Sequence, residues 1–328
     1  MDLPDLADLR AAARVVSLPL VTRFRGVNHR EALLLRGPEG WTEFSPFLEY
    51  GDDEASVWLA AAIDFGWRTQ PAALRDRVPV NATVPAVTAA EVSAVLARFD
   101  GCRTAKVKVA ERGQTLADDV ARVRAVRAAM GSEGRVRLDA NGGWNVDEAE
   151  RAVHALAEFD LEYLEQPCAE VAELAELRER LADWGIPIAA DESVRKAADP
   201  LAVARAGAAD LVVVKAQPLG GVTRALEIVG AAGLPAVVSS ALDTSIGLSM
   251  GLALAAALPD LPYDCGLGTA SLLAADVVAA PLQPAGGSLP VGRVEADAGL
   301  LAQHAASAER RDWWLDRLER CHAILAAG

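Results

Sequence analysis

Residues 161–193 read LEYLEQPCAEVAELAELRERLADWGIPIAADES and contain one complete strand–helix–strand unit. Residues 161–164 and 188–190 are short apolar runs of the kind that form buried strands. The apolar residues between them recur at three- and four-residue spacing, which predicts a helix with one apolar face. This face consists of Val171, Leu174, Leu177, Leu181 and Trp184. A strand, a helix and a second strand in this order are typical of a parallel α/β architecture.

The same alternation extends to both sides of this stretch, from about residue 80 onward. Further helices are predicted at residues 116–130 and 145–159, and the second begins with Asn145 and Glu148 in the spacing of a capping box. The other predicted strands are 80–84, 104–109, 136–138, 211–214 and 236–238, with a much weaker eighth candidate at 261–264. Repeated strand–helix units of this kind predict a fold of the α/β class.

The first eighty residues follow a different pattern. Predicted strands at 30–36 and 40–44 flank a Gly-Pro-Glu-Gly turn, and a helix is predicted at 52–65. We therefore expect a small α+β domain at residues 1–78, ahead of a barrel at 79–285. The remaining segment, 286–328, ends in a helix with Trp and Leu residues, and we expect it to pack back on the first domain.

Composition excludes several classes of function. The net charge of −14 argues against nucleic-acid binding, because phosphate contacts need a basic surface. A carboxylate substrate would have to be attracted locally, by a bound cation and a few basic side chains. No apolar run approaches the roughly 20 residues that cross a bilayer. The N-terminus lacks the pattern of a secretory signal, and the four cysteines form no C-x-x-C pair, so a cytoplasmic location is predicted.

Polar side chains follow the predicted strands at the points where each strand ends. Successive groups are separated by 24 to 31 residues, which matches one strand–helix unit. The carboxyl ends of barrel strands meet at the face where active sites are built, so these side chains should share one cavity. They are Lys106, Lys108, Asp139, Asn141, Glu165, Asp191, Glu192, Lys215, Ser239 and Ser240.

The three acids Asp139, Glu165 and Asp191 would repel one another in a shared cavity unless a cation neutralised them. A hard dication such as Mg²⁺, held by carboxylate oxygens, fits this requirement. Lys108 and Lys215 would face each other across the metal, where one of them could act as a base. The predicted chemistry is removal of a proton next to a substrate carboxylate, with the metal stabilising the enediolate.

The other polar residues are given supporting roles. Lys106 alternates with Lys108 and should point into the barrel on the same side, where it would tune charge or hold substrate. Asn141 would bond substrate or a metal ligand. Glu192 would be a partner of a lysine or of the metal site without touching the reacting atoms.

These motifs resemble those of the muconate-lactonising subgroup of the enolase superfamily. The resemblance lies in K-x-K (106–108), D-x-N (139–141), E-Q-P (165–167), D-E-S (191–193) and the strand-end Lys215. It implies an α+β capping domain joined to a modified (β/α)₇β TIM-like barrel, with Mg²⁺ or Mn²⁺ as cofactor. It also implies that Asp139, Glu165 and Asp191 bind the metal and that the two lysines form the acid/base pair.

Within that subgroup, VSSALDTSIGL (238–248) and CGLGT (265–269) resemble the o-succinylbenzoate synthases. Those hydro-lyases of menaquinone biosynthesis dehydrate 2-succinyl-6-hydroxy-2,4-cyclohexadiene-1-carboxylate. The resemblance implies that Lys108 takes the α-proton and returns it to the leaving hydroxyl, while the charge of Lys215 stabilises the enediolate. It also implies which residues contact the succinyl tail, namely Ser239, Ser240, Gly266 and Thr269.

Other functions stay open at this point. An N-acylamino acid racemase would use the same lysine pair, alone or as a second activity. A dipeptide epimerase fits less well, since SSALDTS stands where a D-x-D motif would hold a substrate ammonium group. A non-catalytic metal-binding barrel is the alternative from another class. The oligomeric state is left open, and a monomer is compatible with the sequence.

Overall fold

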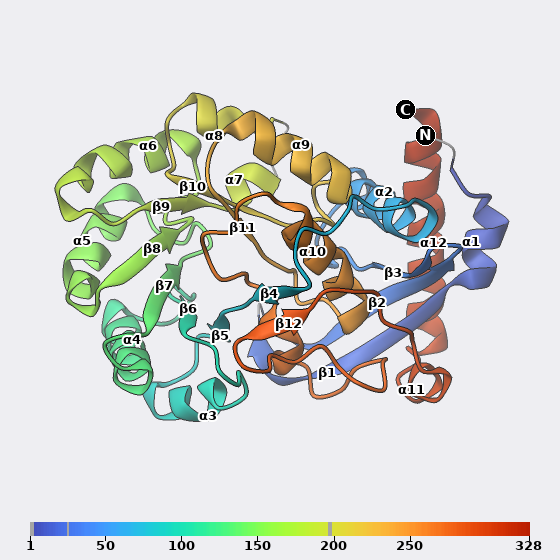
Figure 1. Ribbon diagram of the computed structural model, residues 1–328, viewed down its shortest axis with the longest axis horizontal. Coiled ribbons are helices and arrows are strands. Elements are labelled where there is room, and N and C mark those ends of the chain that lie inside the picture. Colours follow the sequence, from blue (N-terminus) through green and yellow to red (C-terminus); the bar gives the residue numbers. More distant parts are fainter. Residues whose placement is uncertain (1–2, 25, 196–198) are drawn as a thin grey trace.

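Seven parallel strands curl into the central sheet of the computed structural model, which describes residues 3–24, 26–195 and 199–328 (Figure 1). Seven of the predicted barrel strands are present, with bounds that differ by two residues at most. In order across the sheet they are β11 (Ala236–Val238), β10 (Leu211–Val214), β9 (Ile188–Ala190), β8 (Leu161–Glu165), β7 (Arg135–Asp139), β6 (Thr104–Lys108) and β5 (Ala82–Val84).

The two edges of this sheet meet at Cys265 and Gly266, which form isolated parallel bridges to Val80 and Ser239. The amide of Cys265 donates to the carbonyl of Pro79 at 2.8 Å, and the amide of Gly266 donates to that of Val238 at 2.8 Å. The eighth strand predicted at 261–264 is therefore wrong in position. Pro262 lies within that range and has no amide hydrogen for a strand ladder.

Helices follow the strands and cover the outer face of the sheet (Figure 1). The helix predicted at 171–184 ends earlier, because α6 stops at Arg180 and a short 3-10 turn, η3 (Ala182–Trp184), follows. The barrel helices are α3 (Val92–Leu96), α4 (Leu116–Met130), α5 (Val146–Leu156), α6 (Val171–Arg180), α7 (Glu192–Arg195), α8 (Ala202–Arg205), α9 (Val222–Ala232) and α10 (Ser245–Ala257). The remaining 3-10 turns are η1 (Ala89–Glu91), η2 (Ala157–Phe159) and η4 (Gly268–Leu272).

The predicted capping box of α5 is confirmed. The side chain of Asn145 accepts a hydrogen bond from the amide of Glu148 at 2.9 Å, and the Glu148 carboxylate accepts from the amide of Asn145 at 3.0 Å. Two amides that lack partners within the helix are thereby satisfied.

Replacing Asn145 by alanine should lower the free energy of unfolding by about 1 kcal/mol, because the first turn of α5 loses its cap. Urea unfolding followed by circular dichroism measures this as a lower midpoint at unchanged slope. Asn28→Ala, at an exposed position in the capping domain, is the control. An unchanged midpoint for Asn145→Ala would show that this cap contributes nothing to stability.

A three-stranded antiparallel sheet forms the core of the N-terminal region. Its strands are β1 (Arg14–Phe24), β2 (Val27–Gly37) and β3 (Gly40–Phe44), in that order. The predicted hairpin is confirmed, since Gly37 pairs with Gly40 across the turn. Helix α1 (Leu6–Ala12) precedes the sheet, and α2 (Asp52–Trp67) extends two residues beyond its predicted end.

The C-terminal segment returns to this region. Strand β12 (Ser288–Pro290) pairs with β4 (Arg77–Pro79), and after α11 (Ala298–Gln303) the long helix α12 (Ala308–Ala327) packs against α2 and α1. Trp314 of α12 is fully buried, and its indole Nε1 donates to Glu31 at 2.8 Å. Figure 1 accordingly shows α12 beside α1 and α2. The limits 1–78, 79–285 and 286–328 stay a prediction, and residues 1 and 2 lie outside the described part of the chain.

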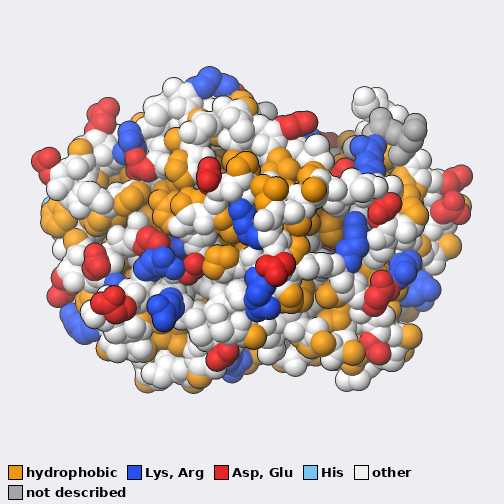
Figure 2. Space-filling model, viewed as in Figure 1, with side chains coloured by type: hydrophobic (Ala, Val, Ile, Leu, Met, Phe, Trp, Pro, Cys, Tyr) orange, Lys and Arg blue, Asp and Glu red, His pale blue; other side chains and the backbone are white. Residues whose placement is uncertain are grey.

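The surface seen in Figure 2 carries Lys and Arg side chains interspersed with Asp and Glu side chains. Within residues 3–24, 26–195 and 199–328, we find no helix with the length and apolar character needed to cross a bilayer.

Candidate active site

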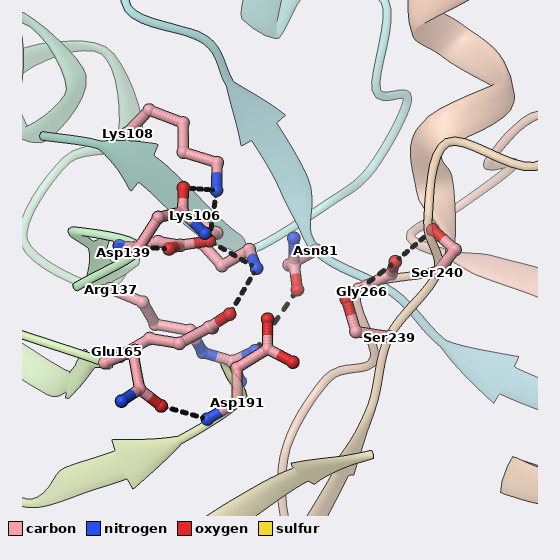
Figure 3. Close-up of polar contacts among 12 residues, drawn as sticks. Asn81, Lys106, Lys108, Arg137, Asp139, Glu165, Asp191, Ser239, Ser240 and Gly266 are labelled. Atoms are coloured by element: carbon pink, nitrogen blue, oxygen red, sulfur yellow. Dashed lines mark hydrogen bonds and ion pairs between the residues drawn. The ribbon is translucent and has the colours of Figure 1, made fainter. Parts of the chain in front are cut away.

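The register of the barrel strands places the predicted site residues in one row. Lys108 pairs with Asp139 across β6 and β7, and Asp139 pairs with Glu165 across β7 and β8. Side chains on paired positions of neighbouring strands point to the same side of a sheet. All three side chains therefore enter the barrel interior at the carboxyl ends of the strands, as Figure 3 shows.

Lysine side chains hold the three acids in the barrel interior. The Nζ of Lys106 lies 2.8 Å from Asp139 Oδ2 and 2.8 Å from Glu165 Oε1. The Nζ of Lys108 lies 2.6 Å from the same Asp139 oxygen. Lys215, which follows β10, forms an ion pair with Asp191, which follows the neighbouring strand β9. The sequence places the lysines beside a metal, but the structure pairs each of them directly with a carboxylate.

Burial and charge set the ionisation of these acids. Burial raises the pKa of Glu165, and the negative charge of Asp139 adds to this effect, so that the pKa is about 7. Burial also acts to raise the pKa of Asp191, but the charges of Lys215 and Arg195 outweigh it and hold the pKa at about 2. The pKa of Asp139 is lowered, because its two lysine partners likewise outweigh burial. Burial lowers the pKa of the Lys215 ammonium group.

A cavity of about 40 Å³ lies between these side chains and the capping domain. Ten of the predicted site residues line it, and these are Lys106, Lys108, Asp139, Asn141, Asp191, Lys215, Ser239, Ser240, Gly266 and Thr269. A wider outer cavity of about 400 Å³ shares Phe24, Lys108 and Asn141 with the inner one. An organic substrate needs several hundred Å³, so side chains of the inner cavity must move to admit it.

Two predicted residues are not among the cavity-lining residues. Glu165 is buried behind Lys106, to which it is bonded. Glu192 accepts hydrogen bonds from Asn141 at 3.2 Å and from Arg195 at 2.6 Å. Glu192 thus contacts the site through Asn141 and Arg195 and not through a lysine, and its predicted role as a partner of a lysine or of the metal stays a prediction.

The wall opposite Lys106 and Lys108 is formed by Ser239, Ser240 and Gly266 (Figure 3). The hydroxyl of Ser240 donates to the carbonyl of Gly266 at 2.9 Å and lies 2.7 Å from the hydroxyl of Thr269. These four residues, predicted to contact substrate, are therefore adjacent to one another. Their contact with a substrate stays a prediction.

Sequence reasoning missed several residues of the cavity wall. Arg195 is buried there, and it donates to Asp191 at 3.1 Å and to the hydroxyl of Tyr50 at 3.0 Å. A signal existed, because Arg195 stands four residues after Asp191, which is the spacing of an ion pair on one helix face. The capping domain adds three aromatic side chains that no local pattern marked, namely Phe24, Phe47 and Trp58.

The donor set fits a hard dication in its chemistry. Three buried carboxylates converge at neighbouring strand ends, and mutual repulsion contributes to the raised pKa of Glu165. Carboxylate oxygens are the ligands that Mg²⁺ and Mn²⁺ prefer. As the side chains stand, however, no group of three or more acidic, His or Cys residues in the described ranges is arranged to hold an ion. The lysine ammonium groups occupy the positions next to the carboxylates instead, so the metal-ligand assignment stays a prediction.

Family models match both parts of the chain. Residues 15–66 match the enolase N-terminal domain-like family, and residues 88–300 match the enolase C-terminal domain-like family. The chain belongs to the enolase superfamily, whose members use a divalent metal ion. The predicted capping domain and barrel architecture is thereby confirmed.

Relatives narrow this class to one group of enzymes. The chain is 56 % identical over 323 residues to the o-succinylbenzoate synthase of Mycolicibacterium smegmatis, covering 98 % of both chains. It is 54 % identical over 324 residues to the o-succinylbenzoate synthase of Mycobacterium tuberculosis, covering 98 % of this chain and 97 % of the relative.

Solved structures with lower identity share the fold. The 2-chloromuconate cycloisomerase of Rhodococcus opacus superimposes with a TM-score of 0.76 at 24 % identity, and the match covers 90 % of this chain and 98 % of the other. The muconate lactonizing enzyme of Pseudomonas putida superimposes with a TM-score of 0.74 at 21 % identity and the same coverage.

Proposed function

We propose that this protein is an o-succinylbenzoate synthase, which dehydrates 2-succinyl-6-hydroxy-2,4-cyclohexadiene-1-carboxylate to o-succinylbenzoate. The observation that carries the proposal is the 54–56 % identity to synthases of that name over nearly the whole chain. The site chemistry supports it, because basic side chains and acids converge on one cavity at the carboxyl ends of the barrel strands. Elimination of water next to a carboxylate needs such a set.

In this proposal, Asp139, Glu165 and Asp191 would hold Mg²⁺ or Mn²⁺, which supplies positive charge beside the substrate carboxylate when it is bound. The substrate carboxylate would lie between the lysines, and its ring and tail would extend toward the serine wall. Phe24, Phe47 and Trp58 from the capping domain would exclude water from the ring. Exclusion of water strengthens the electrostatic interactions within the site.

The reaction then proceeds through one proton transfer in each direction. Once the proposed cation neutralises Asp139 in place of Lys108, the Lys108 ammonium group would release its proton to solvent and act as the base. Its Nζ takes the proton from the ring carbon next to the carboxylate, and the electrons of that C–H bond move into the carboxylate as an enediolate. The Lys215 ammonium group stabilises the added negative charge. The electrons return to form a ring double bond as the C–O bond to the hydroxyl breaks, and Lys108 donates its proton to make water. The product ring is aromatic, which drives the second step.

A cytoplasmic location is part of the proposal. All four cysteines, Cys102, Cys168, Cys265 and Cys321, are free thiols, which fits a reducing compartment.

The purified protein with Mg²⁺ should consume the cyclohexadiene substrate, measured as loss of its absorbance, and release o-succinylbenzoate. A parallel incubation with an N-succinylamino acid, followed by polarimetry, tests the racemase alternative on the same sample. Turnover of the first compound supports the synthase. Racemisation without any dehydration would show that the lysine pair serves the alternative reaction.

A further inference from the structure

The cavity wall that follows β11 has a strained backbone. Ala241 and Leu242 line the cavity beside Ser240, and Leu242 has a φ of 63°. This left-handed conformation costs a bulky residue about 1 kcal/mol or more, so neighbouring contacts must hold it. Two buried side chains of the capping domain contact the segment that contains Leu242.

The first contact is made by Arg30 of β2, which is buried. Its Nε donates to the carbonyl of Leu242 at 3.1 Å, and its Nη2 donates to the hydroxyl of Ser45 at 3.0 Å. The guanidinium carbon lies 4.5 Å from the ring centre of Phe47, which is itself a cavity residue. Arg30 thus contacts both Leu242, in the strained part of the cavity wall, and Phe47, which lines the cavity from the capping domain.

The second contact is made by Glu43 of β3, which is fully buried. Its Oε2 accepts from the amides of Thr244 and Gly247, at 3.1 Å each, and from the Thr244 hydroxyl. Its Oε1 accepts from the hydroxyl of Ser45 at 2.6 Å. Thr244 is the N-cap of α10, so this carboxylate fixes both the end of the wall and the start of the next helix.

The fit between Glu43 and α10 is close. A Cβ atom at Gly247 would lie 2.8 Å from Cδ and Oε2 of Glu43 and 2.8 Å from Cβ of Asp243, so only glycine allows this approach. Next to it, Asp243 is also buried and accepts from Gln217 at 3.0 Å. Burial and the nearby Asp243 raise the pKa of Glu43 to about 7. Two acids buried side by side are a weak source of stability, which favours a role in fixing geometry.

We propose that Glu43 and Arg30 are positioning residues, which hold residues 241–244 in the shape that receives the tail of the substrate. They touch the wall and not the reacting atoms, so they act on how tightly the tail is bound. The inference rests on the proposed function, because the tail is the succinyl group of that substrate. It assigns part of substrate recognition to capping-domain residues that lie behind the cavity surface.

The test compares Glu43→Gln with the wild-type enzyme in steady-state kinetics. The kinetics are measured above pH 8, where Glu43 with a pKa of about 7 is ionised. Glutamine then keeps the shape of the side chain but loses its charge and its acceptor for the Ser45 hydroxyl. Loss of a hydrogen bond to a charged group predicts a KM about tenfold higher, with kcat within about threefold of wild type. Binding of o-succinylbenzoate should weaken by a similar factor, whereas binding of benzoate, which lacks the tail, should not change.

Gly247→Ala tests the same contact from the barrel side, because the added methyl group would displace Glu43 and the adjacent Asp243 without altering either side chain. It should reproduce the rise in KM, and it decides the matter if Glu43→Gln does not fold. Glu31→Gln is the structural control, since Glu31 on β2 accepts from Arg310 and Trp314 of α12. This control should lower the melting temperature and leave KM unchanged.

The experiment distinguishes failure of the positioning role from failure of the proposed function on which that role rests. If the wild-type enzyme neither turns over the cyclohexadiene substrate nor binds o-succinylbenzoate, the proposed function fails. If the wild-type enzyme does both and the Glu43 and Gly247 variants match its KM, only the positioning role fails. Equal weakening of o-succinylbenzoate and benzoate would also contradict the inference, because it would indicate general damage to the cavity.

Discussion

Lys108→Ala and Lys215→Ala should each lower kcat by at least about a hundredfold, within the range expected for loss of an acid–base group. Both ammonium groups lie in the cavity, and each is bonded to one of the acids proposed to hold the metal. Removing Lys108 leaves no group to take and return the proton. Removing Lys215 takes away a positive charge from the place where negative charge develops.

Single-turnover and steady-state rates on the cyclohexadiene substrate measure this loss. Arg98→Ala, which also removes one positive charge but at an exposed position, is the control and should retain wild-type kcat. Circular dichroism checks that each lysine variant keeps its fold. Wild-type rates for both lysine variants would mean that the assigned mechanism is wrong.

Removal of divalent cations with EDTA should lower turnover by about a thousandfold or more, because a bound cation contributes several kcal/mol of charge stabilisation. Addition of excess Mg²⁺ should restore the rate. The physical reason lies in Glu165, whose pKa is raised to about 7 by burial and by the charge of Asp139. The raised pKa indicates that the ion pair with Lys106 does not fully neutralise this carboxylate. A dication would complete this neutralisation.

Glu165→Gln separates a metal effect from other effects of the chelator. The variant should keep its fold but show little activity at any Mg²⁺ concentration, since the amide replaces one charged ligand of the proposed site. Wild-type enzyme incubated with EDTA already saturated with Mg²⁺ is the matched control and should lose no activity. Full activity of wild-type enzyme in EDTA would contradict metal dependence.

Much of the fold could be predicted because the barrel repeats a simple pattern. Short apolar strands such as 188–190 and 211–214 were located to the residue, since both faces of a parallel strand are buried and the run is uninterrupted. The same periodicity located the site, because strand-end residues such as Lys108 and Lys215 face one cavity whatever their separation in sequence. In the barrel, the strands indicated by the local sequence pattern are the strands that the fold contains.

The capping domain was less predictable. Strand β1 was not expected, because Pro19 interrupts its apolar run. The strand tolerates proline since it lies at the edge of its sheet, and its pairing with β2 shifts register between Pro19 and Phe24. The closing segment at Cys265 and Gly266 comes directly after the predicted range 261–264, and only isolated bridges hold it. Short elements fixed by tertiary contacts leave little local signal.

Site residues that are fixed only by tertiary contacts are equally hard to predict from the sequence. Arg30 and Glu43 lie more than 190 residues before the Leu242 and Thr244 groups that they contact. Neither residue stands at the end of a barrel strand, so the spacing argument that found Lys108 could not find them. The direct pairing of the lysines with the acids was also unexpected, because it depends on side-chain conformation and not on strand position.

The central claim is that Asp139, Glu165 and Asp191 share one divalent ion. A crystal grown with Mn²⁺ and measured near the manganese absorption edge tests it most directly, because the anomalous signal locates the ion without reference to the side chains. We expect one peak within about 2.0–2.3 Å of an oxygen from each of the three carboxylates. A peak elsewhere, or acids still bonded only to Lys106, Lys108 and Lys215 at saturating Mn²⁺, would contradict the claim.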